Sequence, residues 1–527
     1  MVDASSLDAP HSDGPQTLSH RQILVVFSGL ILAVMLAALD STIVTTALPT
    51  IVGELGGLEQ LSWVVTAYLV GQTIVTPIYG KLGDLYGRKG VLQGAILLFL
   101  IGSMLCGASQ SMSQLIFFRW VQGLGGGGLM ATTQAVVGDI VPPLQRGRYQ
   151  GIFGAVFGVA SVAGPLIGGY FTTYWTWRWI FYINLPLGLV AMLVLAKTLP
   201  SVSRKVSHQI DYAGALLIAL TLTSVILMAD LGGTVYSWDS PLVIGLGVTA
   251  CLCLGLFIWV ESRAMEPIMP LGLFLNRTFT VSVFLSMIVG FSLWGSVTYL
   301  PVFLQVVKGS SPTESGMQLL PLMGGVLTMS IISGQVISRT GRYKIFPVTG
   351  MFIMTIALWL LTGMDETIRL SVASLYFLLL GLGLGMVMQV LMIAIQNAVE
   401  YRSMGVATSG ALLFRLMGGS LGTAILGVVF ALSLHHHLID LLPAGAADGA
   451  EFSHLTPQWL LKLPSEERGP YMTAFASSFR NVFSVAAVFA AGGFVLAWFL
   501  PELALQKSFS RKSHSADGKQ TPIDVVE

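Results

Sequence analysis

Charged residues are scarce in this chain. Only 10% of its 527 residues are Asp, Glu, Lys or Arg, whereas 54% are hydrophobic, and the mean hydropathy is +0.77. A water-soluble protein of this length needs far more charge to cover its surface. The composition therefore excludes a soluble domain, and we expect a multi-pass protein of the cell (inner or plasma) membrane.

Cysteine is almost absent, which limits redox and metal chemistry. Cys106, Cys251 and Cys253 all fall in apolar stretches, and the last two point to different sides of one helix. A histidine triplet at 435–437 invites a metal interpretation, but consecutive helical residues face different ways and no other Cys or His cluster lies nearby. We expect no disulfide and no metal site, and we interpret the triplet as part of an interfacial loop.

Nucleotide-binding signals are missing as well. The glycine runs at 123–128 and 381–385 follow no strand and lack the Gly-Lys-Ser/Thr ending of a phosphate-binding loop. No Ser/His/Asp constellation falls at helical spacing inside the apolar segments. We expect no enzyme, no cofactor and no nucleic-acid partner.

Long apolar segments make up most of the chain. Fourteen of them are long enough to cross about 30 Å of hydrocarbon as helices. They are predicted at residues 23–48, 60–79, 91–108, 113–138, 149–171, 179–197, 211–229, 241–260, 278–304, 315–337, 345–363, 370–395, 406–430 and 479–499. Most Lys and Arg residues lie in the even-numbered connections and the two tails, so we expect both termini to be cytoplasmic.

An internal repeat divides the chain. The stretch Gly80–Lys89 recurs in degraded form at Gly334–Arg342, again between two apolar segments. Parallel repeats of this kind build one class of secondary transporter. The predicted division is a cytoplasmic tail (1–21), a six-helix bundle (22–200), two inserted helices (201–265), a second six-helix bundle (266–505) with an external loop at 431–478, and a second cytoplasmic tail (506–527).

Several further motifs follow one another in a specific order. They are Leu39-Asp40-Ser41-Thr42 through Ala47-Leu48-Pro49, the Gly80–Lys89 stretch, Arg119-Trp120-Val121-Gln122-Gly123, Gly164-Pro165-Leu166-Ile167-Gly168-Gly169 and the run Trp177–Pro186. On these motifs the chain resembles the major facilitator superfamily, and within it the fourteen-span drug:proton antiporters of the EmrB/QacA type. The resemblance implies an all-α fold of two six-helix bundles plus two inserted helices, and alternating access. It also implies proton-driven efflux of amphipathic compounds, with antibiotic resistance as a consequence.

Asp40 is an acidic residue near the middle of the first predicted span. Inserting a carboxylate there into the membrane costs on the order of 2.5–3.5 kcal/mol of free energy, and such a cost indicates a functional role. Burial disfavours its charged form and a nearby cation favours it, so alternating surroundings would let Asp40 take up and release a proton. Arg119 is the natural cation, and we expect both side chains to face a central cavity. A static buried pair is the alternative.

The Gly80–Lys89 stretch is predicted to be a conformational latch. Asp84 can accept hydrogen bonds from Arg88 and from the N-terminal end of a facing helix, while Gly83 and Gly87 allow a tight turn. With Gly80 these residues form the latch. The second copy has Ser338 in place of the acid, so we expect a one-sided latch. A simple positive-inside topology signal is the alternative.

The Gly164–Gly169 motif places a proline among small residues in one span. The resemblance implies that Gly164, Pro165, Gly168 and Gly169 shape the cycle of an exporter or antiporter. Ordinary small-residue packing is the alternative.

Substrate contacts are the least specified part of the sequence. We expect adaptable recognition by aromatic and neutral polar side chains. The candidates are Thr45, where the family usually has Asn, with Gln122, Trp294, Tyr299, Gln389 and Asn397. No carboxylate falls in the spans of the second half, so strong selection for dications is not expected. An exporter of a dedicated metabolite, lipid or siderophore, or a non-transporting sensor or scaffold, remains an alternative. Expected partners are small amphipathic molecules, protons and membrane lipid; a periplasmic adaptor or outer-membrane channel is left open.

Overall fold

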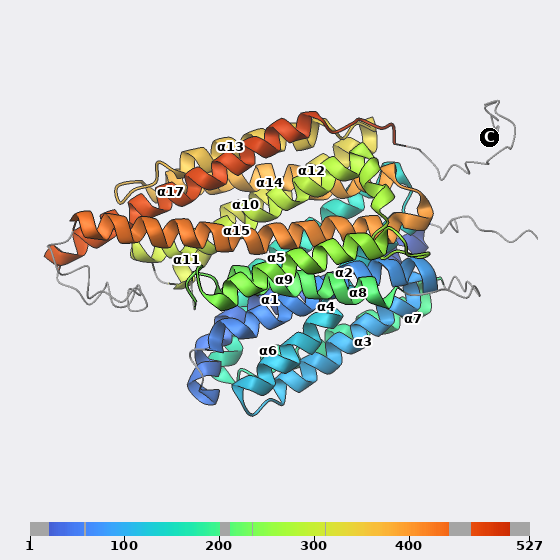
Figure 1. Ribbon diagram of the computed structural model, residues 1–527, viewed down its shortest axis with the longest axis horizontal. Coiled ribbons are helices and arrows are strands. Elements are labelled where there is room, and N and C mark those ends of the chain that lie inside the picture. Colours follow the sequence, from blue (N-terminus) through green and yellow to red (C-terminus); the bar gives the residue numbers. More distant parts are fainter. Residues whose placement is uncertain are drawn as a thin grey trace, which may run out of the picture.

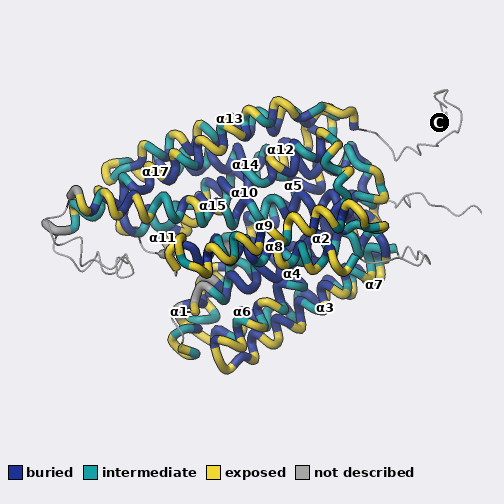
Figure 2. Tube along the Cα trace, in the orientation of Figure 1, coloured by how far each residue is buried: buried dark blue, intermediate teal, exposed yellow. Residues whose placement is uncertain are grey.

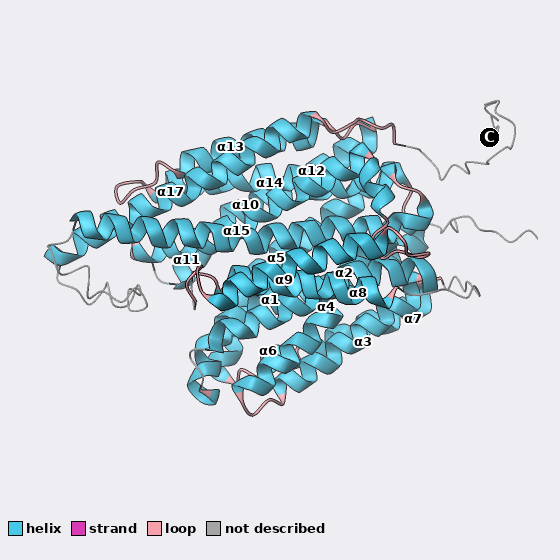
Figure 3. Ribbon diagram, viewed as in Figure 1, coloured by secondary structure: helices cyan, strands magenta, loops and turns pink. Residues whose placement is uncertain are grey.

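The computed structural model describes residues 20–56, 60–200, 211–233, 236–310, 312–441 and 465–505. In these ranges the secondary structure consists of helices and turns, with one isolated bridge between Gly232 and Tyr236 (Figure 3). The predicted tails at 1–21 and 506–527 lie almost entirely outside the described residues.

Each of the fourteen predicted spans coincides with a helix or a broken helix. They are α1 (His20–Leu55), α2 (Leu61–Tyr86), α3 (Arg88–Gly107), α4 (Met112–Ile140), α5 (Arg146–Tyr174), α6 (Trp179–Tyr182) with α7 (Asn184–Thr198), α8 (Tyr212–Leu231), α9 (Pro241–Glu261), α10 (Arg277–Val306), α11 (Pro312–Gln318) with α12 (Leu320–Thr340), α13 (Ile345–Leu361), α14 (Leu370–Ala398), α15 (Met404–Leu441) and α17 (Ser465–Trp498).

Among the described residues, eleven segments are both long and apolar enough to cross a membrane, and α13 is a shorter apolar helix. The helices α2 and α4 are long enough, at 26 and 29 residues, but carry more polar side chains. Most of α4 is buried, including Arg119 and Gln122. These two helices are therefore surrounded mainly by protein, which lets them hold polar groups that lipid would not tolerate.

The helices form two bundles, as the sequence predicted. In the first, α4 packs against α2 and α3, and α1 packs against α5 and α7; in the second, α10 packs against α15, and α14 against α12 and α13 (Figure 1). Large apolar clusters fill each bundle, and buried residues concentrate along the bundle axes (Figure 2). The all-α architecture of two six-helix bundles and two extra helices is confirmed.

The extra helices α8 and α9 pack against each other and lie between the bundles in sequence. Of the pair, α8 also contacts α2 in the first bundle and α15 in the second. The inserted pair therefore covers one side of the seam between the bundles.

The bundles meet closely at one end of the molecule, which we call the basic face because it carries Arg88, Arg146 and Arg342 at helix ends. The helix pairs α2 with α15 and α5 with α12 make the most extensive contacts across the seam, and α4 with α15 and α5 with α14 also cross it. A Cβ at Gly80 would lie 2.7 Å from the carbonyl oxygen of Gly405, and one at Gly334 would lie 2.1 Å from that of Gly147. Because the two repeat glycines make equivalent backbone contacts, the duplication in sequence is also a duplication of the interface.

Two predicted loop boundaries are wrong. The Gly80–Lys89 stretch is helical except at Gly87, because α2 continues to Tyr86 and α3 begins at Arg88. The loop predicted at 431–478 is helical at both ends, since α15 runs to Leu441 and α17 begins at Ser465. The histidine triplet at 435–437 thus lies on α15; within the described ranges no group of three potential metal ligands is found.

Candidate functional site

The carboxylate of Asp40 is completely buried in the middle of α1. Its Oδ2 accepts a hydrogen bond of 2.6 Å from Nη1 of Arg119. Its Oδ1 accepts from the side-chain amides of Gln122, at 2.8 Å, and Asn184, at 3.2 Å. The predicted ion pair is present, and two neutral amides complete its hydrogen bonding.

The groups around this ion pair all belong to the first bundle. The guanidinium of Arg119 lies 4.3 Å from the ring centroid of Tyr68, over its face, and its Nε donates to the carbonyl of Val64. Ser103 accepts hydrogen bonds from both amides and donates to a backbone carbonyl. A buried charge is stable only when paired and hydrogen-bonded, and this network supplies both conditions.

The expectation that Asp40 and Arg119 face a central cavity is wrong for this conformation. Both are at most 1% exposed, and neither belongs to the cavity described below. Gln122, a predicted substrate contact, binds Asp40 through its amide. Asn184, for which the sequence predicts no role, does the same. Both amides can replace water around a carboxylate, so the pair is satisfied without access to a cavity.

The predicted small-residue motif forms a tight contact between α5 and α1. A Cβ at Gly164 would lie 2.1 Å from Oγ1 of Thr42, and one at Gly168 would lie 2.9 Å from the carbonyl oxygen of Ile43. The hydroxyl of Thr42 donates to the carbonyl of Ala160 across this contact at 3.0 Å. Thr42 is two residues from Asp40, so the same part of α1 carries the ion pair on one side and the α5 contact on another.

Pro165 lies inside α5 next to this contact. Proline cannot donate a backbone hydrogen bond, so it weakens the helix locally. Gly169, in contrast, has no atom within 4 Å of its would-be Cβ. The glycines of the motif are therefore not equivalent.

This difference predicts distinct outcomes for neighbouring alanine substitutions. Gly168→Ala places a methyl group against the α1 backbone and should destabilise the protein by about 1–3 kcal/mol through overpacking. Gly169→Ala has room and should be neutral. Thermal unfolding of the two purified variants checks this, and equal melting temperatures would contradict the tight α1–α5 contact.

At the basic face, Asp84 joins the two bundles. Its Oδ1 accepts a hydrogen bond of 3.0 Å from the backbone N–H of Gly405, and its Oδ2 accepts one of 2.9 Å from that of Val406. These N–H groups lie in the first turn of α15 and have no partner within the helix. Asp84 also forms an ion pair with Arg88, whose Nε donates to Asp139 at 2.8 Å. The hydrogen-bond partners expected for Asp84, namely Arg88 and a helix N-terminus of the other bundle, are present, and Asp139 joins them although nothing in the sequence singled it out.

The glycines of this region have separate roles. Gly87, with φ of +89°, forms the corner between α2 and α3, as expected. Gly83 is helical, and a Cβ there would lie 2.6 Å from Nη1 of Arg88. Gly83 therefore makes room for the Arg88 side chain and does not form the turn, which corrects the prediction.

The second copy of the motif makes a different contact. The hydroxyl of Ser338 donates back to the carbonyl of Gly334 in its own helix, and Arg342 is exposed. Across the α5 side of the seam, Nη1 of Arg146 donates to the carbonyl of Gln396 in the second bundle at 3.0 Å. In the sequence Arg146 is one of the basic residues of an even-numbered connection, and no motif there predicts this contact.

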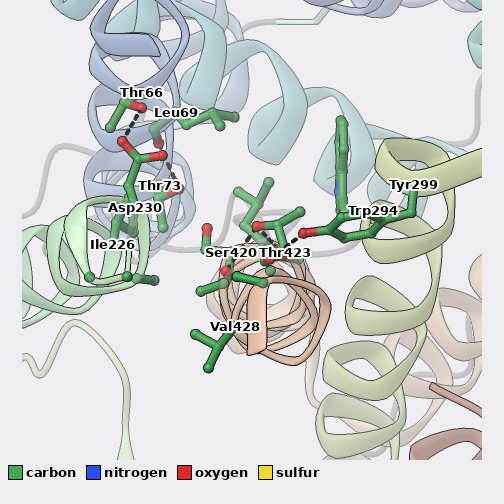
Figure 4. A pocket seen from close by; sticks show the side chains of 18 residues that line it. Thr66, Leu69, Thr73, Ile226, Asp230, Trp294, Tyr299, Ser420, Thr423 and Val428 are labelled. Atoms are coloured by element: carbon green, nitrogen blue, oxygen red, sulfur yellow. Dashed lines mark hydrogen bonds between the residues drawn. The ribbon is translucent and has the colours of Figure 1, made fainter. Parts of the chain in front are cut away.

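A cavity of about 400 Å³ lies between the bundles, on the side where α8 covers the seam. Figure 4 shows Asp230 hydrogen-bonded to Thr66 on one side and Trp294 with Tyr299 on the other. Small residues of α15 lie between them. The lining residues are Thr66, Leu69, Thr73, Ile226, Ala229, Asp230, Gly232, Gly233, Trp294, Tyr299, Leu416, Gly419, Ser420, Thr423, Ala424, Gly427, Val428 and Ala431.

Two of the six predicted substrate contacts line this cavity, namely Trp294 and Tyr299. Gln389 is buried, with its amide nitrogen close to Gly154 in the other bundle. Asn397 donates weakly to the carbonyl of Ala504 near the basic face. Thr45 is part of α1, but its side chain lies outside the described part of the structure.

Comparison with known proteins agrees with the fold and the motifs. The family model for the Major Facilitator Superfamily matches residues 30–423. An uncharacterized MFS-type transporter of Mycobacterium tuberculosis is 42% identical over 98% of this chain and 75% of its own length. The multidrug transporter protein MdtP of Bacillus subtilis is 36% identical over 97% of this chain and 98% of its own length.

A solved structure has a similar fold. The human organic anion transporter MFSD10 aligns with a TM-score of 0.60 at 15% identity, covering 89% of this chain and 99% of its own. At that identity the likeness concerns the fold alone. The family match and the relatives show that this chain is a transporter of the major facilitator superfamily that resembles, within that superfamily, the drug:proton antiporters.

Proposed function

We propose that this protein exports amphipathic organic compounds across the cell membrane in exchange for protons, with Asp40 as the proton carrier. The observation that carries the proposal is the buried Asp40–Arg119 ion pair, held by Gln122 and Asn184. Relatives that are named multidrug transporters and efflux pumps support export.

Protonation of Asp40 would change the forces on α1. The neutral carboxyl no longer attracts Arg119, and the buried guanidinium then lacks its counter-charge, which is unfavourable in a low dielectric. The first bundle must rearrange to satisfy Arg119. Helix α1 packs on α5 through Gly164 and Gly168, and α5 packs on α12 of the second bundle. A movement of α1 would therefore displace α5 at the seam between the bundles.

The positive-inside rule places the basic face in the cytoplasm. In that orientation the Asp84 and Arg146 contacts close the cytoplasmic side of the seam, and the cavity lies toward the external ends of α2 and α8. Such a conformation suits the release of substrate to the outside. The closed contacts then have to open before substrate enters from the cytoplasm, which is alternating access.

Transport into everted membrane vesicles tests the proposal, with vesicles that lack this protein as the control. The vesicles have an acidic interior, and uptake of each compound of a substrate panel is measured. Some amphipathic compounds should accumulate inside, and collapse of the pH gradient with a protonophore should stop their uptake. Accumulation that persists without a proton gradient would contradict proton coupling. Failure to move any compound would favour the sensor or scaffold alternative, and movement of a single metabolite, lipid or siderophore would favour a dedicated exporter.

A further inference from the structure

Asp230 gives the cavity between the bundles a single negative charge. It lies one residue before the end of α8, in the inserted pair, and its Oδ2 accepts a hydrogen bond of 2.8 Å from Oγ1 of Thr66 on α2. Among the described residues that line the cavity, it is the only Asp, Glu, Lys or Arg.

Aromatic side chains form the wall opposite this carboxylate. A Cβ at Gly419 would lie 2.4 Å from Cδ1 of Trp294, so the indole lies directly against the glycine backbone. The Trp294 side chain is still partly exposed, at 39%. The hydroxyl of Tyr299 donates to the carbonyl of Thr423 at 3.3 Å, which fixes the second ring (Figure 4).

We propose that this cavity binds monovalent amphipathic organic cations, with Asp230 as the counter-charge and Trp294 and Tyr299 as the surface for the apolar body of the ligand. The inference rests on the proposed transport function and specifies the substrate class of its site.

The charge and size of the cavity support this class. A carboxylate in a protected cavity attracts a cation more strongly than one in water does, and aromatic faces also attract cations. A dication would leave one charge without a counter-charge, and an anion would be repelled by Asp230. A volume of about 400 Å³ falls within the range of about 300–1,000 Å³ that is typical of sites for drug-sized ligands.

Binding of tetraphenylphosphonium, a permanent monovalent cation with an apolar body, tests the site. The full chain is placed in nanodiscs of zwitterionic lipid, and the dissociation constant is measured by equilibrium dialysis against empty nanodiscs. Asp230→Asn keeps the shape of the side chain but removes its charge, so the dissociation constant should rise about tenfold or more. Asp230→Glu should retain most of the affinity.

Asp239→Asn is the matched control, because Asp239 is exposed in the connection between α8 and α9 and does not line the cavity. It should bind as the wild type does. Equal melting temperatures of the variants establish that each is folded. An unchanged dissociation constant in Asp230→Asn, or no binding of the cation by the wild type above the empty nanodiscs, would overturn the proposal.

The same preparations separate this inference from the proposed function. If Asp230 governs cation binding but a pH gradient drives no flux in proteoliposomes, the binding site stands and proton-driven export fails. If the gradient drives flux of other compounds while Asp230→Asn leaves cation binding unchanged, the reverse holds.

Discussion

Asp40→Asn is expected to abolish transport driven by a pH gradient while the protein remains folded in the membrane. The amide has nearly the shape of the carboxyl but cannot take up and release a proton at physiological pH. Arg119 keeps a hydrogen-bond acceptor in the amide oxygen, so the packing around it should survive. Accumulation of substrate in proteoliposomes with an imposed pH gradient is the measurement.

Two further results make this expectation specific. Substrate binding and exchange of substrate at equal concentrations on both sides should persist in Asp40→Asn, because neither needs net proton movement. Asp40→Glu retains the acid and should recover part of the driven transport. Full driven accumulation by the purified Asp40→Asn variant would remove Asp40 as the carrier and leave the static ion pair as its role.

Asp84→Asn should open the basic face. The substitution weakens the pair with Arg88 within the first bundle. It also weakens two charge-assisted contacts to the first turn of α15, which cross the seam and therefore require the bundles to be closed at this end. A loss of about 1–2 kcal/mol would shift the populations of the two states by roughly fivefold to thirtyfold. A cysteine introduced into the seam near Gly80 should then react faster with a membrane-impermeant thiol reagent from the cytoplasmic side.

Ser338→Ala is the matched control in the second repeat. The hydroxyl of Ser338 bonds only to a carbonyl of its own helix among the contacts described, so its loss should leave labelling and transport close to wild type. Equal labelling in both variants, or no change in Asp84→Asn, would contradict a one-sided latch.

The fold could be predicted almost completely from the sequence. Apolar segment length specifies where helices cross a bilayer, and the repeat spacing specifies how the bundles are related. The errors lie at helix ends, as in the long α15 and α17, because helices that project beyond the hydrocarbon continue with polar residues that hydropathy does not detect.

The residues of the candidate site could be predicted from the sequence only where they are charged and their position is unusual. Asp40 and Arg119 stand out because charge in an apolar segment is costly, and Asp84 stands out because it is the acid of a repeated motif. Their neutral partner Asn184 carries no such signal, and Gln122 was placed in the wrong role for the same reason. Asp230 was missed because it lies one residue beyond the predicted span 211–229, where an acidic residue carries no cost. Only the folded structure places Trp294 across the cavity from it.

The partners of Asp84 in the second bundle are main-chain N–H groups, and this has an evolutionary consequence. Every residue except proline supplies an N–H, so the side chain at position 406 can change without loss of the contact, subject to its own packing. Position 405 is restricted to glycine, because a Cβ there would lie 2.2 Å from Nη1 of Arg88 and 2.6 Å from the carbonyl oxygen of Gly80. The second half of the gene can therefore diverge while the first half retains the acid. A duplicated transporter with such a contact tolerates decay of one motif copy, as Ser338 illustrates, and a proline at position 406 is the substitution that selection should remove there.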